Sequence, residues 1–284
     1  MYRFAVLIIL ARPAFLALTG CTGIGLITPP TSVDLYVADT GNNRVVRMAD
    51  MSGTNWVSIG TLGSGAYHFS SPTAVTVDAN GLIYVADTNN HRIVRMNDMF
   101  GTGWTSFGSF GTGTNQFQYP AGVAVDDLGN IYIADTGNAR IVRITDMTGT
   151  GWVGYGSAGT GSGEFAAPVD IAIDNLHRIC ILDKDNDRLA RISDMSGAGW
   201  VTYGSTQFNA PEGLSLSAAG AIYVADTGNS RIVRFTDMTG TGQTTLTTHD
   251  YFNALNTYQP KGISVGIDGN LYIADSANHH VRTW

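Results

Sequence analysis

Residues 120–156 read PAGVAVDDLGNIYIADTGNARIVRITDMTGTGWVGYG, and much of the remaining chain consists of copies of this stretch. Its core phrase, IYIADTGNARIVR, starts at Ile131, and related phrases start at Leu35, Ile83, Ile179, Ile222 and Leu271. One aspartate marks each copy, and the six are Asp39, Asp87, Asp135, Asp183, Asp226 and Asp275. The steps between them are 48, 48, 48, 43 and 49 residues. A repeat of this length is one supersecondary unit that stacks on its neighbours.

Each copy is expected to contain four short strands separated by turns. In the third copy the strands are predicted at residues 122–126, 131–134, 140–144 and 152–155. Glycine, asparagine and aspartate lie between these segments, and these residues favour turns because they tolerate positive φ or bond to nearby backbone amides. No long helical apolar period occurs in the repeats. The sequence therefore predicts an all-β protein in which helix is nearly absent.

The sizes of the residues indicate how the sheets are arranged. The first strand of each copy is built from small residues, among them Ala74, Gly122, Ala172, Gly213 and Gly262. The fourth strands open with large residues, namely Trp56, Trp104, Trp152 and Trp200. Wedge-shaped sheets packed around an axis need small inner strands and bulky outer ones, and radial stacking also protects strand edges. We therefore expect a six-bladed β-propeller of four-stranded antiparallel blades.

The order of these phrases resembles the NHL-repeat family. A PxGVAVD-like strand precedes a YVADTGNxRI strand pair, and a glycine-rich stretch ending in Phe-x-x-Pro follows, as in GTGTNQFQYP from Gly111 and GTGSGEFAAP from Gly159. The triplet that names the family is best preserved in Asn90-His91-Arg92 and Asn278-His279-His280. The resemblance runs from about Leu35 to the end of the sequence. It implies a propeller, and the members of that family have many different functions.

Composition narrows the classes of function. The chain has 284 residues, is 44% hydrophobic and carries a net charge of −7. Nucleic-acid binding needs a surplus of Lys and Arg on one face, so the acidic balance argues against it. Some NHL propellers bind RNA through a basic surface, and the charge of this chain weighs against the same activity here.

The first 20 residues are set apart from the repeats, which gives two predicted regions: a signal segment at 1–20 and the propeller at 21–284. Residues 1–20 are a short apolar run with Arg3 near its start. Leu18-Thr19-Gly20-Cys21 resembles the lipobox of bacterial lipoproteins, in which the cysteine is lipidated, and this implies a lipid-anchored or exported protein of the bacterial cell envelope. Arg12-Pro13 interrupts the apolar run. An uncleaved hydrophobic anchor and a misassigned start therefore stay open.

The repeats supply only five first strands, so the N-terminal region is expected to help close the ring. Residues 24–28 are the available strand, either in the sixth blade or as the first strand of blade one. The second cysteine, Cys180, stands where the other copies have tyrosine, which indicates a smaller core residue. With Cys21 lipidated, no disulfide is expected.

Comparison of the copies separates scaffold residues from candidate site residues. The set Asp135, Asn138 and Arg140 recurs in most copies, and we interpret it as a hairpin cap with an ion pair. Copy four departs most, with Asp183-Lys184-Asp185-Asn186-Asp187-Arg188. Aspartates at alternate positions open an oxygen-ligand calcium loop, so Asp183, Asp185 and Asp187 are candidate Ca²⁺ ligands; a solvated charged hairpin is the alternative.

Histidines are the other candidate site residues. His91 and His279 occupy equivalent hairpin positions, and His280 follows His279, but neither spacing is a zinc signature. Together with the copy-four residues, including Lys184 and Arg188, they are the candidates for the ligand face, which is the face of the hairpins and of the blade-to-blade loops. No catalytic residue is assigned.

Three interpretations of function follow. The favoured one is a non-catalytic binding or scaffold propeller, monomeric, with an unknown protein or small ligand on its top face and no nucleic acid. The second is a metal-dependent propeller hydrolase or lyase, and the third is a recently amplified array with little selected function. Calcium is the only cofactor that the residues suggest.

Overall fold

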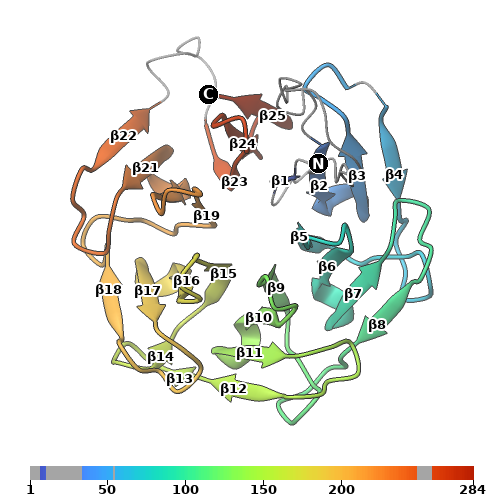
Figure 1. Cartoon of the computed structure of the whole chain (residues 1–284), viewed down its shortest axis with the longest axis horizontal. Helices are drawn as coiled ribbons and strands as arrows, with labels where there is room; N and C mark the ends of the chain where they lie inside the picture. Colours follow the sequence, from blue (N-terminus) through green and yellow to red (C-terminus); the bar gives the residue numbers. More distant parts are fainter. Residues whose placement is uncertain (1–6, 11–33, 54, 248–257) are drawn as a thin grey trace, which may run out of the picture.

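The computed structural model describes residues 7–10, 34–53, 55–247 and 258–284. Six antiparallel sheets stand around a central axis as the blades of a propeller (Figure 1). In each blade the strands follow one another from the axis to the rim in chain order. The expected all-β, six-bladed architecture is therefore confirmed.

The strands fall into four concentric sets. The first strands, nearest the axis, are β1 (Leu7–Leu10), β5 (Pro72–Val77), β9 (Pro120–Val125), β15 (Pro168–Ile173), β19 (Gly213–Leu216) and β23 (Pro260–Val265). The second strands are β2 (Asp34–Asp39), β6 (Ile83–Asp87), β10 (Ile131–Asp135), β16 (Ile179–Asp183), β20 (Ile222–Asp226) and β24 (Leu271–Asp275). The third strands are β3 (Arg44–Met48), β7 (Arg92–Met96), β11 (Arg140–Ile144), β17 (Arg188–Ile192), β21 (Arg231–Phe235) and β25 (His280–Thr283). The rim strands are β4 (Val57–Ile59), β8 (Thr105–Phe107), β12 (Val153–Tyr155), β18 (Val201–Tyr203) and β22 (Thr244–Thr247).

Short elements connect these sets. One turn of 3-10 helix joins the second strand to the third in blades one to five: η1 (Thr40–Asn42), η2 (Thr88–Asn90), η3 (Thr136–Asn138), η4 (Lys184–Asn186) and η5 (Thr227–Asn229). The linker from blade three to blade four adds a two-residue parallel pair, β13 (Ser157–Ala158) with β14 (Glu164–Phe165). Among the described residues, no helix is long and apolar enough to cross a membrane.

The N-terminal part of the ring differs from expectation. Strand β1 pairs antiparallel with β2, with Leu7 opposite Val37, and so supplies the inner strand of blade one. This strand belongs to the segment expected to be a signal. The strand expected at residues 24–28 lies outside the described residues, and blade six has three described strands, β23, β24 and β25.

Hydrophobic packing joins the blades face to face. The described residues contain six buried clusters, and each spans one blade-to-blade interface. The cluster that closes the ring packs Leu35 and Val46 of blade one against Tyr272 of blade six. Since the apolar residues of each second strand face both neighbours, no blade could bury them alone. This is why the repeat must form a closed array.

Each linker contributes an aromatic side chain to these interfaces. Phe69, Phe117 and Phe165 are fully buried in the linkers to blades two, three and four. The ring of Phe117 lies 5.3 Å from that of Trp152, centroid to centroid, so the bulky outer strand meets the linker of its own blade. Gly108 makes this possible, because its φ is +107° and a Cβ there would lie 2.5 Å from the Phe117 ring.

A buried carboxylate ties each hairpin to the linker that enters its blade. In blade three, Asp135 is fully buried and accepts hydrogen bonds from Asn138 Nδ2 at 2.8 Å, Arg140 Nε at 2.7 Å and the backbone N–H of Gln118 at 2.7 Å. Arg140 then donates to three linker carbonyl oxygens, those of Thr112, Gly113 and Gln116. We call this arrangement the Asp–Asn–Arg clamp.

The clamp recurs around the ring with one variation. The marker aspartates of blades two to six all accept a hydrogen bond from a linker N–H, donated by Ser70, Gln118, Ala166, Asn209 and Gln259. In blade six, His280 occupies the arginine position, and Arg282 Nε lies 3.4 Å from Asp275 instead. The interpretation of these residues as scaffold is therefore supported by their contacts.

Replacing the clamp carboxylate of blade four should destabilise the protein strongly. Asp183→Ala leaves the guanidinium of Arg188 buried without its carboxylate, so we expect the free energy of unfolding to fall by about 3 to 5 kcal/mol. Asp185→Ala, two residues away on the exposed side of the same turn, should change it by less than about 0.5 kcal/mol. Urea unfolding of both variants measures the difference. Equal losses would contradict the role of the clamp.

Candidate functional site

The hairpins, the linkers and the starts of the first strands all lie on one face of the ring. The register shows this directly, because Pro120 at the start of β9 pairs with Asp135 at the end of β10, next to η3. We call this the hairpin face. It is where the sequence placed the candidate ligand-binding residues, and it surrounds one mouth of the central channel.

The copy-four residues do not converge into a metal site. Asp183 is fully buried and is the carboxylate of the clamp, whereas Asp185 is exposed. The Oδ1 of Asp187 accepts a hydrogen bond of 2.7 Å from the backbone N–H of Ala210, in the linker to blade five. Arg188 is buried and donates to Asp183. In the part of the chain that the structure describes, no three His, Cys, Asp or Glu residues form a group that could hold a metal ion. The turn thus offers calcium no ready set of oxygen ligands.

His91 links two blades. Its φ is +54°, and its Nδ1 accepts a hydrogen bond of 3.1 Å from the backbone N–H of Tyr119, in the linker to blade three. The ring also packs against Phe110 and Tyr119, with centroids 4.9 and 4.6 Å apart. Burial lowers the pKa of His91, and the charge of Asp135 opposes that shift. His91 is therefore an acceptor between blades in its neutral form.

The same contact is made by different side chains in other blades. Asn43 and Asp187 stand at the position of His91 and accept from the backbone N–H of Ser71 and Ala210. In blade three this position is Ala139, whose side chain has no acceptor, and the backbone N–H of Ala167 donates to Asp183 instead. The backbone N–H group in each of these linkers is thus bonded either to the hairpin side chain of the preceding blade or to the marker aspartate of its own blade.

The remaining sequence candidates lie apart from His91. His279 and His280 are exposed at the hairpin of blade six, and blade one separates them from blade two. His279 adopts the same positive φ as His91, and His280 Nδ1 bonds to the carbonyl oxygen of Asn278. The three histidines thus lie in two separate places and do not form one site. Cys21 lies outside the described residues.

Cys180 is a core residue. It is 1% exposed, and burial raises the pKa of its thiol to about 12. A nucleophilic cysteine needs a stabilised thiolate, and the burial here has the opposite effect. This agrees with its interpretation as a replacement for a core tyrosine.

A row of three charged side chains interrupts the repeat on the hairpin face. Glu212, at the start of the first strand of blade five, bonds to Lys184 Nζ of blade four at 2.8 Å and to Lys261 Nζ of blade six at 2.7 Å. Burial raises the pKa of Glu212, but the charge of Lys261 and the hydrogen bonds from both lysines outweigh it, so the pKa is lowered. We call Lys184, Glu212 and Lys261 the charged row.

Other blades have neutral residues at these places. The residue aligned with Lys184 is a threonine in four blades and a serine in blade six: Thr40, Thr88, Thr136, Thr227 and Ser276. Each of the threonines donates to the carbonyl oxygen of a proline in the next blade, for example Thr136 to Pro168 at 2.6 Å. The residues aligned with Glu212 in blades two, three and four are Thr73, Ala121 and Val169. The charged row is therefore a departure that the scaffold does not require.

One further acidic residue stands on a first strand, at the wall of the channel. Asp170 lines a cavity of about 180 Å³ bounded by first strands, at a place where other copies have alanine or glycine. Its oxygens accept from the backbone N–H groups of Ile171 at 2.9 Å and Leu214 at 2.8 Å. Burial raises the pKa of Asp170 to about 7, although those two hydrogen bonds lower it. It is the one buried carboxyl among the described first-strand residues.

Of the charged row, the sequence predicts only Lys184 as a site residue, as part of the candidate calcium turn; Glu212, Lys261 and Asp170 are not among the predicted site residues. The sequence does contain a sign of this difference. Glu212 and Lys261 each follow directly after the proline that opens a first strand, and the earlier copies have neutral residues there. Comparing the copies position by position at the starts of the first strands would have found them.

The fold and contacts define a class: a six-bladed β-propeller whose blades are tied by repeated polar clamps. A family model for the NHL repeat matches residues 69–96, 117–144, 208–235 and 257–284, so this six-bladed propeller contains NHL repeats in blades two, three, five and six. Blade four, which carries Lys184 and Asp170, is not among the matched segments.

Solved structures share the fold at low identity. A streptogramin B lyase is 18% identical, with a TM-score of 0.61 over 86% of this chain and 87% of that one. Virginiamycin B lyase from Staphylococcus aureus is 16% identical, with a TM-score of 0.61 over 90% and 82%. A chain of a nidogen/laminin complex is 16% identical, with a TM-score of 0.62 over 81% and 80%. No curated protein sequence matches. These similarities concern the fold, which serves catalysis in some proteins and binding in others.

The contact of His91 should make stability depend on pH. Because the folded pKa of His91 lies below its unfolded value, its contribution is present above about pH 6.5 and is lost as the pH falls through the folded pKa. His91→Asn places there the acceptor that blade one uses and should reduce this pH dependence. Urea unfolding of the wild type and the variant between pH 5 and pH 8 makes the comparison. Identical pH profiles would contradict the assignment.

Proposed function

We propose that this protein is a non-catalytic binding propeller that holds a ligand with an anionic group against the charged row. The observation that carries the proposal is the pairing of Lys184 and Lys261 with one carboxylate, Glu212, across three adjacent blades. Two ammonium groups and one carboxylate have a net charge of +1. A carboxylate or phosphate group on a ligand complements that charge.

The exposure of the lysines supports this role. The side chains of Lys184 and Lys261 retain 30% and 25% of their accessible surface, so solvent and ligands reach them. Each ammonium has three donors, and Glu212 uses one from each. Since Glu212 holds both lysines in place, less side-chain freedom is lost when a ligand binds.

Replacing the charged row with residues that other blades have at these positions should abolish anion binding and preserve the fold. In the variant Lys184→Thr, Glu212→Ala, Lys261→Ala, the threonine can donate to Pro211 as its counterparts do in other blades. A ligand at 100 times its Kd raises the free energy of unfolding by about 2.7 kcal/mol. We expect acetate, citrate, inorganic phosphate or ATP to raise the thermal midpoint of the wild type and to leave the variant unchanged. A matched control is Lys184→Arg, which keeps the charge.

Either of two results would contradict the proposal. One is that none of these anions stabilises the wild type. The other is that the same anion stabilises the triple variant equally.

Catalysis is the alternative, and Asp170 is the observation that favours it. A carboxyl group with a pKa near 7, facing the channel cavity, has the acidity expected of a general base. The fold similarity to lyases raises this possibility without identifying a substrate. An activity that is lost in Asp170→Asn while anion binding is retained would favour a propeller hydrolase or lyase over the binding protein.

We also propose that the protein is held at a bacterial cell envelope by a lipid on Cys21. The support is the sequence Leu18-Thr19-Gly20-Cys21 behind an apolar run. Processing at Cys21 would remove β1 from blade one, and residues 24–28 would then be the segment available to pair with β2. Acyl chains on the cysteine would supply the membrane affinity.

Anchoring is tested by labelling and fractionation. Cells fed radioactive palmitate should label the wild type and not Cys21→Ala, and the wild type should fractionate with membranes. Cys180→Ala is the matched control, because its thiol is buried and labelling should be unaffected. Unlabelled wild type would exclude lipidation at Cys21.

A further inference from the structure

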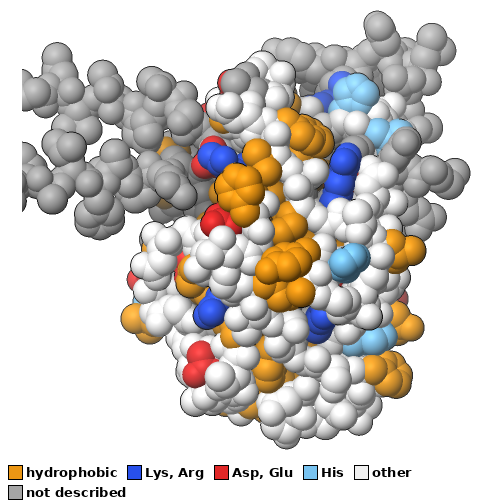
Figure 2. Space-filling model, turned by 90° about the vertical axis from the view of Figure 1, so that its right-hand side faces the viewer, with side chains coloured by type: hydrophobic (Ala, Val, Ile, Leu, Met, Phe, Trp, Pro, Cys, Tyr) orange, Lys and Arg blue, Asp and Glu red, His pale blue; other side chains and the backbone are white. Residues whose placement is uncertain are grey.

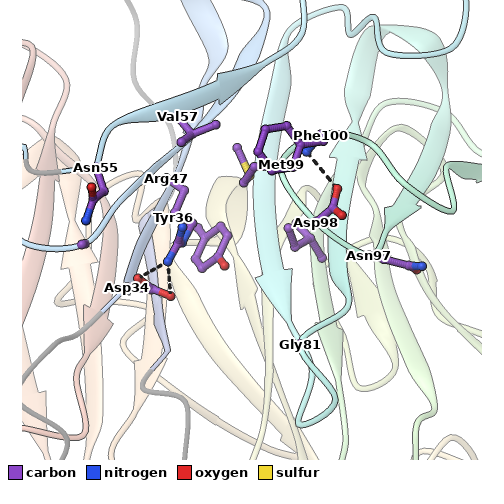
Figure 3. Close-up of a pocket in the computed structure, with 12 residues that line it drawn as sticks. Asp34, Tyr36, Arg47, Asn55, Val57, Gly81, Asn97, Asp98, Met99 and Phe100 are labelled. Atoms are coloured by element: carbon purple, nitrogen blue, oxygen red, sulfur yellow. Dashed lines mark hydrogen bonds and ion pairs between the residues drawn. The ribbon is translucent and has the colours of Figure 1, made fainter.

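A groove of about 560 Å³ lies between blades one and two, at the ends of the strands opposite to the hairpin face. Tyr36 and Arg47 form its floor, Val57 stands on the blade-one side, and Met99 and Phe100 stand on the blade-two side (Figure 3). Pockets of 300 to 1,000 Å³ are the usual size for small-molecule sites. The groove and the charged row share no residue and lie on opposite faces of the ring.

Three residues that line the groove are exceptions within the repeat. At the position of Asp34 the other copies have Leu82, Asn130, Arg178, Ala221 and Asn270. At the position of Asn55 they have glycine, namely Gly103, Gly151, Gly199 and Gly242. At the position of Phe100 they have Ser52, Thr148, Ser196 and Thr239. Two exceptions come from blade one and one from blade two, and the ring brings all three to the same groove.

The polar part of the groove is an ion pair. Arg47 Nη2 donates to both oxygens of Asp34, at 2.7 and 2.8 Å (Figure 3). The two charges compensate each other, while a carboxylate and a guanidinium together present more acceptors and donors than this contact uses. Such a pair suits vicinal hydroxyl groups, which donate and accept at neighbouring atoms. Asn55, exposed at the edge of the groove, adds an amide with both functions.

The apolar part of the groove is an exposed aromatic ring. Phe100 is 80% exposed, the highest value among the exposed large hydrophobic residues of the described chain. In Figure 3 its ring points across the groove toward Val57 of blade one. Exposed hydrophobic side chains gather along this side of the propeller, as Figure 2 shows. An exposed aromatic ring at the wall of a pocket that also holds a few polar groups is a common feature of small-molecule sites.

We propose that this groove binds a neutral saccharide. A pyranose ring has an apolar C–H face that can lie on the Phe100 ring and hydroxyl groups at its edge that can bond to Asp34, Arg47 and Asn55. An anionic ligand is disfavoured, because Asp98 adds a negative charge at the rim while its Oδ1 accepts from the backbone N–H groups of Phe100 and Thr102. The volume accommodates one or two sugar rings.

The experiment is ligand-observed NMR on the full chain. The probes are cellobiose, maltose and N,N′-diacetylchitobiose at millimolar concentrations. At least one disaccharide should show saturation transfer, and Phe100→Thr and Asn55→Gly should each weaken its binding, the former by tenfold or more. These variants carry residues that other blades have at the same positions, and their thermal unfolding verifies the fold.

A matched control separates the groove from general hydrophobic contact. Phe110 is 61% exposed in the linker to blade three, packs against His91 and does not line the groove, so Phe110→Ala should leave disaccharide binding unchanged. The proposal fails if no disaccharide binds. It also fails if Phe110→Ala and Phe100→Thr weaken binding equally, or if an oligolysine peptide binds the groove in place of the saccharides. None of these outcomes affects the test of the charged row.

Discussion

The structure depends on a buried carboxylate in every blade. A fully buried aspartate would destabilise the fold if its charge had no partners, and each one here is surrounded by an asparagine amide, a cationic side chain and, in blades two to six, a linker N–H. The partners come from two parts of the chain, the hairpin of a blade and the linker that enters it. The clamp therefore fixes where the chain passes from one blade to the next, and the hydrophobic clusters can then close around that path.

This division of roles explains how one repeat can carry different surfaces. Second and third strands are buried between blades and change little, whereas hairpin residues and the starts of first strands vary without disturbing the clamp. His91, Asn43 and Asp187 show how tolerant the hairpin is, since three different side chains accept a bond from the next linker. The charged row lies at variable positions of this kind, and the groove between blades one and two lies at variable positions at the opposite ends of the strands.

Much of the fold could be predicted from the sequence because it is repeated. The four strands of copy three were placed within two residues at each end, and the scaffold role of Asp135, Asn138 and Arg140 follows from their presence in most copies. The calcium turn was suggested by the spacing of three aspartates. That spacing does not determine direction, because η4 sends Asp183 inward and leaves Asp185 outside. The charged row was missed because its members come from three blades, and only the ring geometry brings them into contact.

In the part of the chain that the structure describes, the interface between blades six and one has other contacts than the remaining five interfaces. Elsewhere a linker crosses the interface and is bound by a clamp, whereas the described residues join these two blades through the packing of Leu35, Val46 and Tyr272 and through β1. Apolar packing has no directional bonds to break when surfaces slide or separate slightly. Among the described residues, this interface therefore rests on apolar packing and on the pairing of β1 with β2, whereas the other five interfaces also contain a hydrogen-bonded linker.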